Sequence, residues 1–133
     1  LLDRSLVELA GLGHEVRVSD LYGMGFEPVA SAADFERRRF PDRLHYDREQ
    51  KFSHEHDAFR HDIKDEIAKL LWCDLLILHF PLWWFGMPAI LKGWFDRVWA
   101  PGVAFTLGEG AIRPMLTNIR RIGVVTTYGS PGW

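Results

Sequence analysis

The hydrophobic positions in the first part of the chain follow two different periods. Over residues 1–11 apolar side chains recur at the spacing of one helix face, and Gly11 and Gly13 follow, which predicts a helix that ends there. Residues 14–20 (HEVRVSD) then alternate between polar and apolar, as in a short strand. Residues 26–52 are polar and irregular, so we expect a long loop between the first strand and the next helix.

The patterns in the rest of the chain are stronger. An apolar stripe at helical spacing predicts a helix over about residues 55–71. The near-continuous apolar run of residues 74–80 is typical of a parallel strand that is buried on both faces. Pro88 suits the first turn of a helix, and residues 122–126 (IGVVT) predict another buried strand. Strands that alternate with helices in this way indicate an α/β fold with a parallel sheet.

The α/β pattern also indicates where a ligand would bind. At 133 residues the chain has the size of one domain, and we assign residues 1–133 to a single domain. In parallel sheets ligands bind outside the carboxyl ends of the strands. Two loops stand at such ends, PLWWFG (81–86) and TTYGSPG (126–132). If their strands are neighbours, the two loops face one crevice.

Composition narrows the class of protein. The chain is 47% hydrophobic and 26% charged, which fits a globular protein, and its net charge of −2 gives no basic surface for nucleic acid. Cys73 is the single cysteine, which excludes an internal disulfide framework and fits a reducing compartment. No apolar stretch approaches the roughly 20 residues of a membrane helix, so we expect no membrane insertion.

The two loops carry complementary chemistry. Residues 83–85 are three consecutive aromatic residues, and stacking on a flat ligand contributes about 0.5–1.5 kcal/mol per ring beyond area burial. A buried corner or a protein interface would also account for these rings. Thr126, Thr127 and the backbone around Gly129 offer hydrogen-bond donors to the polar edge of a heterocycle. An apolar face and a polar edge together are what a flavin ring requires.

Other polar groups indicate no further site. His54 and His56 alternate and do not form the HExxH zinc motif, so we interpret them, with His45 and His61, as a solvated face. We interpret His79, at a strand end, as structural. We expect no metal site and no catalytic side chain, and we interpret the polar side of the helix after Pro88 as an ordinary solvated face.

Longer motifs resemble a known family. The stretch FPLWWFGMPAILKGWFDRV (80–98), followed by VVTTYGS (124–130), resembles the flavodoxin-like NAD(P)H:quinone oxidoreductases, in the manner of a bacterial relative of the mammalian quinone reductases. The stretches SDLYGMGFEPV (19–29) and YDREQ (46–50) are similar to the same family. The resemblance covers nearly the whole chain.

The resemblance implies a fold and an activity. It implies a doubly wound parallel sheet of strand order 2-1-3-4-5 in a cytoplasmic homodimer that binds FAD, or FMN in some relatives. It further implies that NAD(P)H gives a hydride to the flavin, which then passes two electrons to a quinone or another flat electrophile. The two substrates would alternate in one pocket.

The resemblance also assigns residues. Against the flavin ring system it places Pro81, Leu82, Trp83, Trp84 and Phe85. On the other side and polar edge of that ring it places Thr126, Thr127, Tyr128 and Gly129. It assigns Phe105 to the substrate pocket and the helix of residues 89–99 to a dimer interface. Tyr128 departs from the family pattern, because a glycine is common at that place, and its side chain would reshape the pocket.

Family members have a first strand and a phosphate-binding loop ahead of the first helix, and the Tyr and His that assist hydride transfer lie beyond residue 133. We therefore expect a sheet truncated at both ends, and a chain that folds poorly alone because its first two strands lack the strand between them. Three alternatives stay open: a flavin-binding ancillary subunit of a potassium-efflux system, a small electron-transfer flavodoxin, and a non-catalytic fragment.

Overall fold

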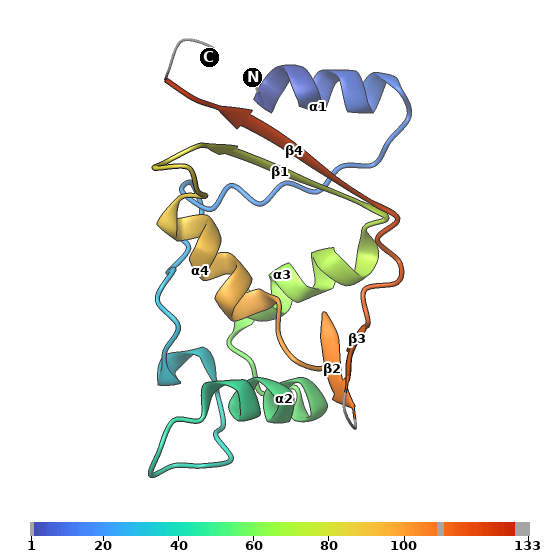
Figure 1. Ribbon diagram of the computed structural model, residues 1–133. Coiled ribbons are helices and arrows are strands. Elements are labelled where there is room, and N and C mark those ends of the chain that lie inside the picture. The colour runs from blue at the N-terminus through green and yellow to red at the C-terminus, as the bar shows by residue number, and fades with distance from the viewer. Residues whose placement is uncertain (1, 109–110, 130–133) are drawn as a thin grey trace.

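Two parallel strands form the centre of the computed structural model, which describes residues 2–108 and 111–129. Strand β1 (Leu75–Pro81) pairs in parallel with β4 (Arg121–Thr127), from Leu75 opposite Arg121 to Pro81 opposite Thr127. Strands β2 (Phe105–Gly108) and β3 (Ala111–Pro114) form a separate antiparallel pair. Both apolar runs predicted as strands are therefore confirmed, and they are neighbours (Figure 1).

Helices lie on both sides of the β1–β4 pair. Helix α1 (Leu2–Gly11) lies on one side, and α3 (His61–Trp72) and α4 (Ala89–Val98) lie on the other (Figure 1). The 3₁₀ turn η1 (Ala32–Asp34) and helix α2 (Tyr46–His56) form the end of the molecule farthest from α1. Helices on the two sides of a parallel pair confirm the α/β prediction.

The core lies between α3, α4 and the inner face of β1. Ile63 and Val98 are fully buried, and Leu70 and Trp94 nearly so. Burying one such side chain contributes about 1.5–3 kcal/mol. A row of aromatic residues extends this core under the long loop: Phe26, Phe35 and Phe59.

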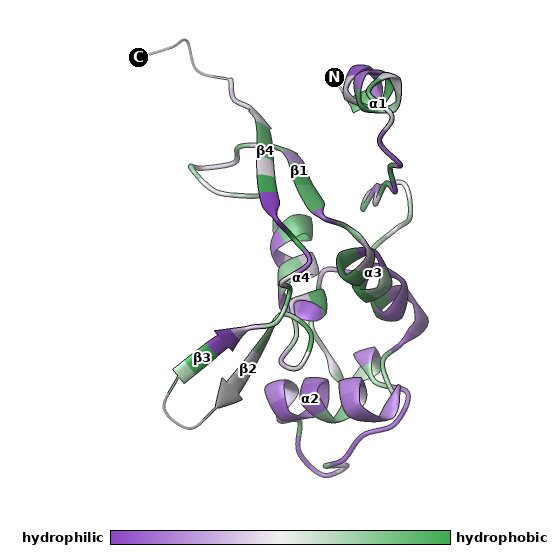
Figure 2. Ribbon diagram, turned by 90° about the vertical axis from the view of Figure 1, so that its right-hand side faces the viewer, coloured by the Kyte–Doolittle hydropathy of each residue, from purple (hydrophilic) through white to green (hydrophobic). Residues whose placement is uncertain are grey.

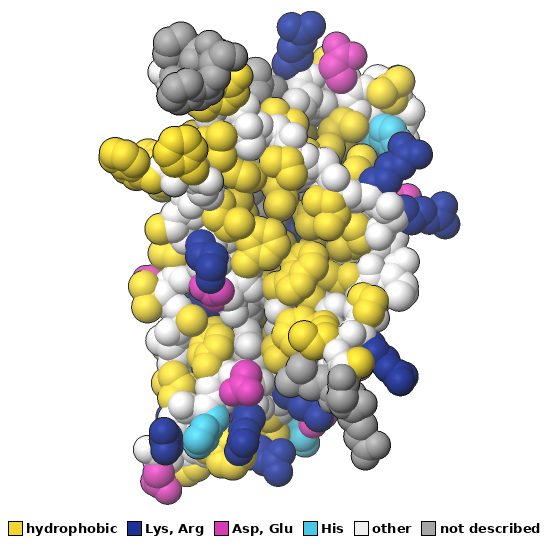
Figure 3. Space-filling model, in the orientation of Figure 1, with side chains coloured by type: hydrophobic (Ala, Val, Ile, Leu, Met, Phe, Trp, Pro, Cys, Tyr) yellow, Lys and Arg dark blue, Asp and Glu magenta, His cyan; other side chains and the backbone are white. Residues whose placement is uncertain are grey.

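The predicted strand at residues 14–20 is wrong. This segment is irregular, because among the described residues no other strand lies beside it to accept and donate its hydrogen bonds. The prediction that β1 and β4 are buried on both faces is also wrong, since Ile122 and Val124 are each 56% exposed. On the face shown in Figure 3, hydrophobic side chains gather over the middle of the molecule and charged ones toward its ends.

The long loop predicted at residues 26–52 contains a helix, α2, and the predicted helix over 55–71 begins only at His61. The two helices are separated at Asp57, whose φ of 50° is left-handed and ends α2. Helix α2 is mostly hydrophilic (Figure 2) and is held by polar contacts. The buried Glu49 carboxylate accepts the backbone N–H groups of Arg39 and Phe40 at 2.7 and 2.9 Å.

A buried ion-pair network fixes the loop to α4. The guanidinium of Arg97 is fully buried, and its Nη2 lies 3.0 Å from Asp34 Oδ1 and 3.0 Å from Asp62 Oδ2. Its Nη1 donates to the backbone oxygen of Glu27 at 2.6 Å. The other oxygen of Asp34 accepts the Tyr46 hydroxyl at 2.5 Å, and burial raises the pKa of Tyr46 well above its ordinary value. The network thereby holds together the loop of residues 27–34 and the helices α2, α3 and α4.

Stability is expected to fall with acidification through Asp62. Hydrogen bonds from Arg60, at 2.7 and 2.6 Å, and from Arg97 hold the pKa of Asp62 well below its ordinary value. A lowered folded-state pKa stabilises the protein above the unfolded pKa of about 3.9, and this contribution is lost as the pH falls below it. Urea denaturation between about pH 5 and 2 is expected to show a shallower decline for Asp62→Asn than for the unsubstituted chain. The matched control is Asp65→Asn, which removes an exposed carboxylate of the same helix.

Gly93 is where α4 packs closest to the long loop. A Cβ atom at this position would lie 2.2 Å from the backbone oxygen of Pro28 and 2.5 Å from its Cα. Backbone atoms cannot swing aside, so Gly93→Ala is expected to lower the free energy of unfolding by about 1–3 kcal/mol or more. The control is Gly11→Ala, where a Cβ would meet nothing within 4 Å. Equal effects of the two substitutions in thermal denaturation would contradict this packing.

Candidate functional site

The two loops predicted to share a crevice do come together. Phe80 lies opposite Thr126 and Pro81 opposite Thr127 at the carboxyl ends of β1 and β4. The N–H of Leu82 then donates to the backbone oxygen of Thr127 at 2.8 Å, which ties the first loop to the second. The structure thereby brings residues 81–85 and 126–129 to one edge of the sheet, where parallel sheets bind ligands.

The aromatic loop is a tight turn. Trp83 and Gly86 exchange two backbone hydrogen bonds, of 2.9 and 3.0 Å, around Trp84 and Phe85. Both central residues are left-handed, with φ of 49° and 63°, which is the geometry of a type I′ turn. Left-handed backbone costs about 1–2 kcal/mol per residue with a side chain. Strain of this kind is concentrated at functional sites.

The turn presents its rings to solvent. Trp84 is 94% exposed and Phe85 is 92% exposed, while Trp83 is 63% exposed. The interpretation of these rings as a buried corner is therefore wrong. Large aromatic surface held outward by strained backbone indicates a surface that binds something flat or apolar.

The second loop supplies polar groups beside the rings. Within the described part of the chain, no acceptor faces the backbone N–H groups of Tyr128 and Gly129. Thr127 is exposed and Thr126 is partly exposed. The Tyr128 side chain is 63% exposed, so its ring adds to the apolar surface near these donors. Exposed rings next to free N–H and hydroxyl donors fit a flat heterocycle with a polar edge, such as a flavin.

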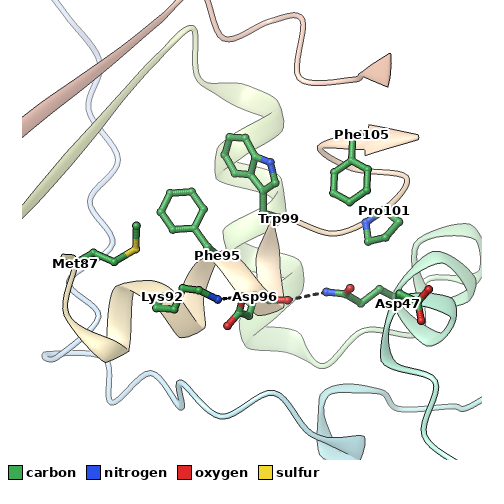
Figure 4. A pocket seen from close by; sticks show the side chains of 9 residues that line it. Asp47, Met87, Lys92, Phe95, Asp96, Trp99, Pro101 and Phe105 are labelled. Atoms are coloured by element: carbon green, nitrogen blue, oxygen red, sulfur yellow. Dashed lines mark hydrogen bonds and ion pairs between the residues drawn. The ribbon is translucent and has the colours of Figure 1, made fainter. Parts of the chain in front are cut away.

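Phe105 lies in a different hollow. This hollow, of about 450 Å³, has Met87 at one end and Phe105 at the other (Figure 4). It is lined by Asp47, Gln50, Met87, Lys92, Phe95, Asp96, Trp99, Pro101 and Phe105. No residue of the two loops lines it, although Met87 directly follows the aromatic turn. The structure therefore separates Phe105 from the predicted flavin residues.

The polar side of α4 was predicted to be an ordinary solvated face, and this is wrong in part. Lys92 and Asp96 form an exposed ion pair that lines the hollow, and Gln50 donates to the Asp96 backbone oxygen at 2.9 Å. Arg97, in contrast, is buried in the network described above. Arg97 follows Trp94 by three residues, so both side chains lie on one face of α4. This spacing is the one sequence signal that could have indicated the burial of Arg97.

The remaining candidates hold no site. His79, at the end of β1, is exposed, and His61 pairs with Asp65 on the surface at 2.8 Å. Over residues 2–108 and 111–129, no group of three or more His, Cys, Asp and Glu is placed to hold a metal ion. In the same ranges no helix has the length and apolar character to cross a membrane.

Comparisons with known proteins find related chains. A family model described as a flavodoxin-like fold matches residues 1–133. A ribosyldihydronicotinamide dehydrogenase-like protein of Penicillium crustosum is 45% identical over 102 residues, which are 77% of this chain and 38% of that protein. NAD(P)H dehydrogenase (quinone) 1 of Cavia porcellus is 40% identical over 119 residues, 89% of this chain and 43% of that protein.

A solved structure is also similar. The NAD(P)H:quinone oxidoreductase from Methanothermobacter marburgensis matches with a TM-score of 0.70 and 30% sequence identity, over 92% of this chain and 55% of that one. This chain therefore spans between 38% and 55% of the length of these three proteins.

Proposed function

Since the chain belongs to the flavodoxin-like fold family, we propose that it serves the FAD-dependent reduction of quinones by NAD(P)H. The observation that carries this proposal is the pairing of an exposed aromatic turn with free donors at the carboxyl ends of two neighbouring parallel strands. The names of its relatives support the same activity, because they are NAD(P)H and ribosyldihydronicotinamide dehydrogenases.

Each loop has a distinct role in this proposal. The rings of Trp84 and Phe85 cover one face of the flavin and exclude water from the reacting atoms. The N–H groups of Tyr128 and Gly129, with the hydroxyls of the two threonines, hold its polar edge and stabilise negative charge there. When bound, the flavin supplies the hydride chemistry, with NAD(P)H and the acceptor using the site in turn.

The hollow beside α4 contributes to the substrate pocket, to which the family resemblance assigns Phe105. Phe95, Trp99 and Phe105 offer flat apolar walls, and the Lys92–Asp96 pair stands at its polar rim. A quinone or another flat electrophile matches such walls. We place a second copy of the chain on this same outer side of α4, as a cytoplasmic homodimer in which the hollow is completed by the partner. This placement follows the family resemblance and the apolar character of the surface.

Flavin titration tests the proposal directly. Adding the folded chain to FAD is expected to quench flavin fluorescence with saturation, and the same titration with FMN compares the two cofactors. Anaerobic addition of NADH or NADPH to the loaded protein is expected to bleach the flavin absorbance, and a soluble quinone is expected to restore it. The proposal is wrong if folded protein binds neither flavin. Flavin binding without bleaching by either nucleotide would favour the electron-transfer or ancillary alternatives.

A further inference from the structure

A buried side chain of α2 presents an unused hydrogen-bond acceptor to the hollow beside α4. Gln50 is 5% exposed, and its Nε2 donates to the backbone oxygen of Asp96 at 2.9 Å. Among the described residues no donor reaches Gln50 Oε1, yet this oxygen is not sealed from solvent. Because Gln50 lines the hollow, the oxygen opens onto it. A carboxamide that is held at its nitrogen offers a ligand one carbonyl oxygen in a fixed direction.

The charged side chains of the hollow leave one carboxylate unpaired. Lys92 and Asp96, both on α4, form an ion pair at its rim. Asp47, in the first turn of α2, also lines the hollow, and no cation of the described residues pairs with its carboxylate. The hollow therefore has an excess of one negative charge, and its described lining residues include no free cation that could hold an anion.

Flat rings form the walls between these polar groups. The ring centroids of Phe95 and Trp99 lie 5.5 Å apart along α4. Figure 4 shows Asp47 and Phe105 at one end of the hollow and Met87 at the other. The faces of aromatic rings attract cations, and the attraction is stronger where water is excluded. The hollow thus combines apolar walls with polar groups that favour positive charge and hydrogen-bond donors.

We infer that this hollow selects flat aromatic molecules that carry a positive charge or N–H donors, and that Asp47 and Gln50 are the residues that set this preference. The preference rests on the proposed function, because it names the class of electron acceptor: quinones and similar flat electrophiles with amino or ammonium groups. A quinone without donors matches the walls but leaves the Gln50 oxygen and the Asp47 carboxylate unused. A sulfonated acceptor places an anion beside the unpaired carboxylate, which disfavours its binding.

Calorimetric titration of the full chain without flavin tests this preference. The probes are three anthraquinones that share one ring system and carry an aminomethyl, a hydroxymethyl or a sulfonate group at the same carbon. At neutral pH these compounds are positive, neutral and negative. The aminomethyl compound is expected to bind at least about tenfold more tightly than the sulfonate, with the hydroxymethyl compound between them. Added salt is expected to reduce this ratio, since the carboxylate stands at an open rim.

Two substitutions at Asp47 separate a charge preference from simple stacking. Asp47→Asn is expected to reduce the ratio of the aminomethyl to the sulfonate affinity by at least about fivefold, and to change hydroxymethyl binding by less than about twofold. Asp47→Lys is expected to invert the preference. The matched control is Glu55→Gln, which removes an exposed carboxylate of α2 that does not line the hollow.

A substitution at Gln50 tests the carbonyl oxygen separately. Gln50→Leu is expected to weaken binding of the two compounds that carry donors by at least about threefold and to leave sulfonate binding unchanged. Thermal denaturation checks that each variant is folded.

Three outcomes would overturn the inference: no binding of the aminomethyl compound, equal binding of the aminomethyl compound and the sulfonate, or a preference that Asp47→Lys leaves unchanged. Because these titrations contain no flavin, such a result beside normal flavin binding contradicts only the preference. Failure of the folded chain to bind flavin, beside the expected preference, contradicts only the proposed function.

Discussion

Replacing Asp34 with alanine is expected to lower the free energy of unfolding by about 3–5 kcal/mol, the range found when one member of a buried ion pair is removed. Asp34 and Arg97 are 1% and 0% exposed, and Asp34 accepts from both Arg97 and Tyr46. Its loss leaves the buried Arg97 cation with one carboxylate, Asp62, beside the Glu27 carbonyl and the Phe26 ring. Urea denaturation measures the change, with Asp65→Ala as the control for an exposed carboxylate in the same part of the fold.

A double substitution shows whether the cost comes from the unpaired charge. Combining Asp34→Ala with Arg97→Met removes both charges and retains an unbranched apolar side chain in place of the guanidinium. The double variant is expected to be more stable than Asp34→Ala alone. If Asp34→Ala costs less than about 1 kcal/mol, or if the two single effects simply add, the network does not stabilise the fold as described.

The second large effect concerns the aromatic turn. The double substitution Trp84→Asn and Phe85→Gly is expected to weaken flavin binding by at least about tenfold, because it removes both rings that the proposed function stacks on the flavin. The same change places Asn-Gly, the preferred pair of a type I′ turn, where two bulky residues hold left-handed backbone. Relief of that strain is expected to raise the free energy of unfolding by about 1–2 kcal/mol. Opposite signs in binding and stability are the signature of a turn shaped for its ligand.

Two variants serve as controls for this turn: one removes an exposed aromatic ring outside the turn, and the other makes only one of the two substitutions. Tyr22→Ala removes a ring that is 76% exposed and far from the turn in sequence, and is expected to leave flavin binding unchanged. Trp84→Asn alone is expected to give about half of each effect. A loss of stability with unchanged flavin binding would show instead that the rings pack against the protein.

The elements that the sequence predicted correctly are those with a local signal. The apolar runs of β1 and β4 and the stripes of α1, α3 and α4 each repeat within a few residues, so their type could be identified without knowing their neighbours. The two loops at the carboxyl ends could be placed together because parallel strands end at the same edge. The turn geometry at Trp84 and Phe85 could not be predicted, since neither residue favours left-handed backbone.

The elements that the sequence missed depend on distant partners. Helix α2 has almost no apolar stripe, and its buried side chains are polar. Glu49 is satisfied by backbone N–H groups of the loop about ten residues earlier, and Gln50 by the Asp96 carbonyl of α4. Residues 14–20 have the alternation of a strand, but alternation forms a strand only where another backbone lies alongside. The separation of Phe105 from the residues predicted to hold a flavin could not be predicted either, because Phe105 begins β2, whose pairing with β3 no periodicity in the sequence encodes.

The Arg97 network also bears on the order in which the chain folds. Its guanidinium joins Asp34, Asp62 and the Glu27 carbonyl, which lie 63, 35 and 70 residues earlier in the chain. Contacts between such distant residues close large loops, and the entropy of closing them is lost before the contacts can compensate. We therefore expect the network to form late, after α3 and α4 have packed, so that weakening it speeds unfolding more than it slows folding. We expect the long loop to be secured late in folding and released early in unfolding.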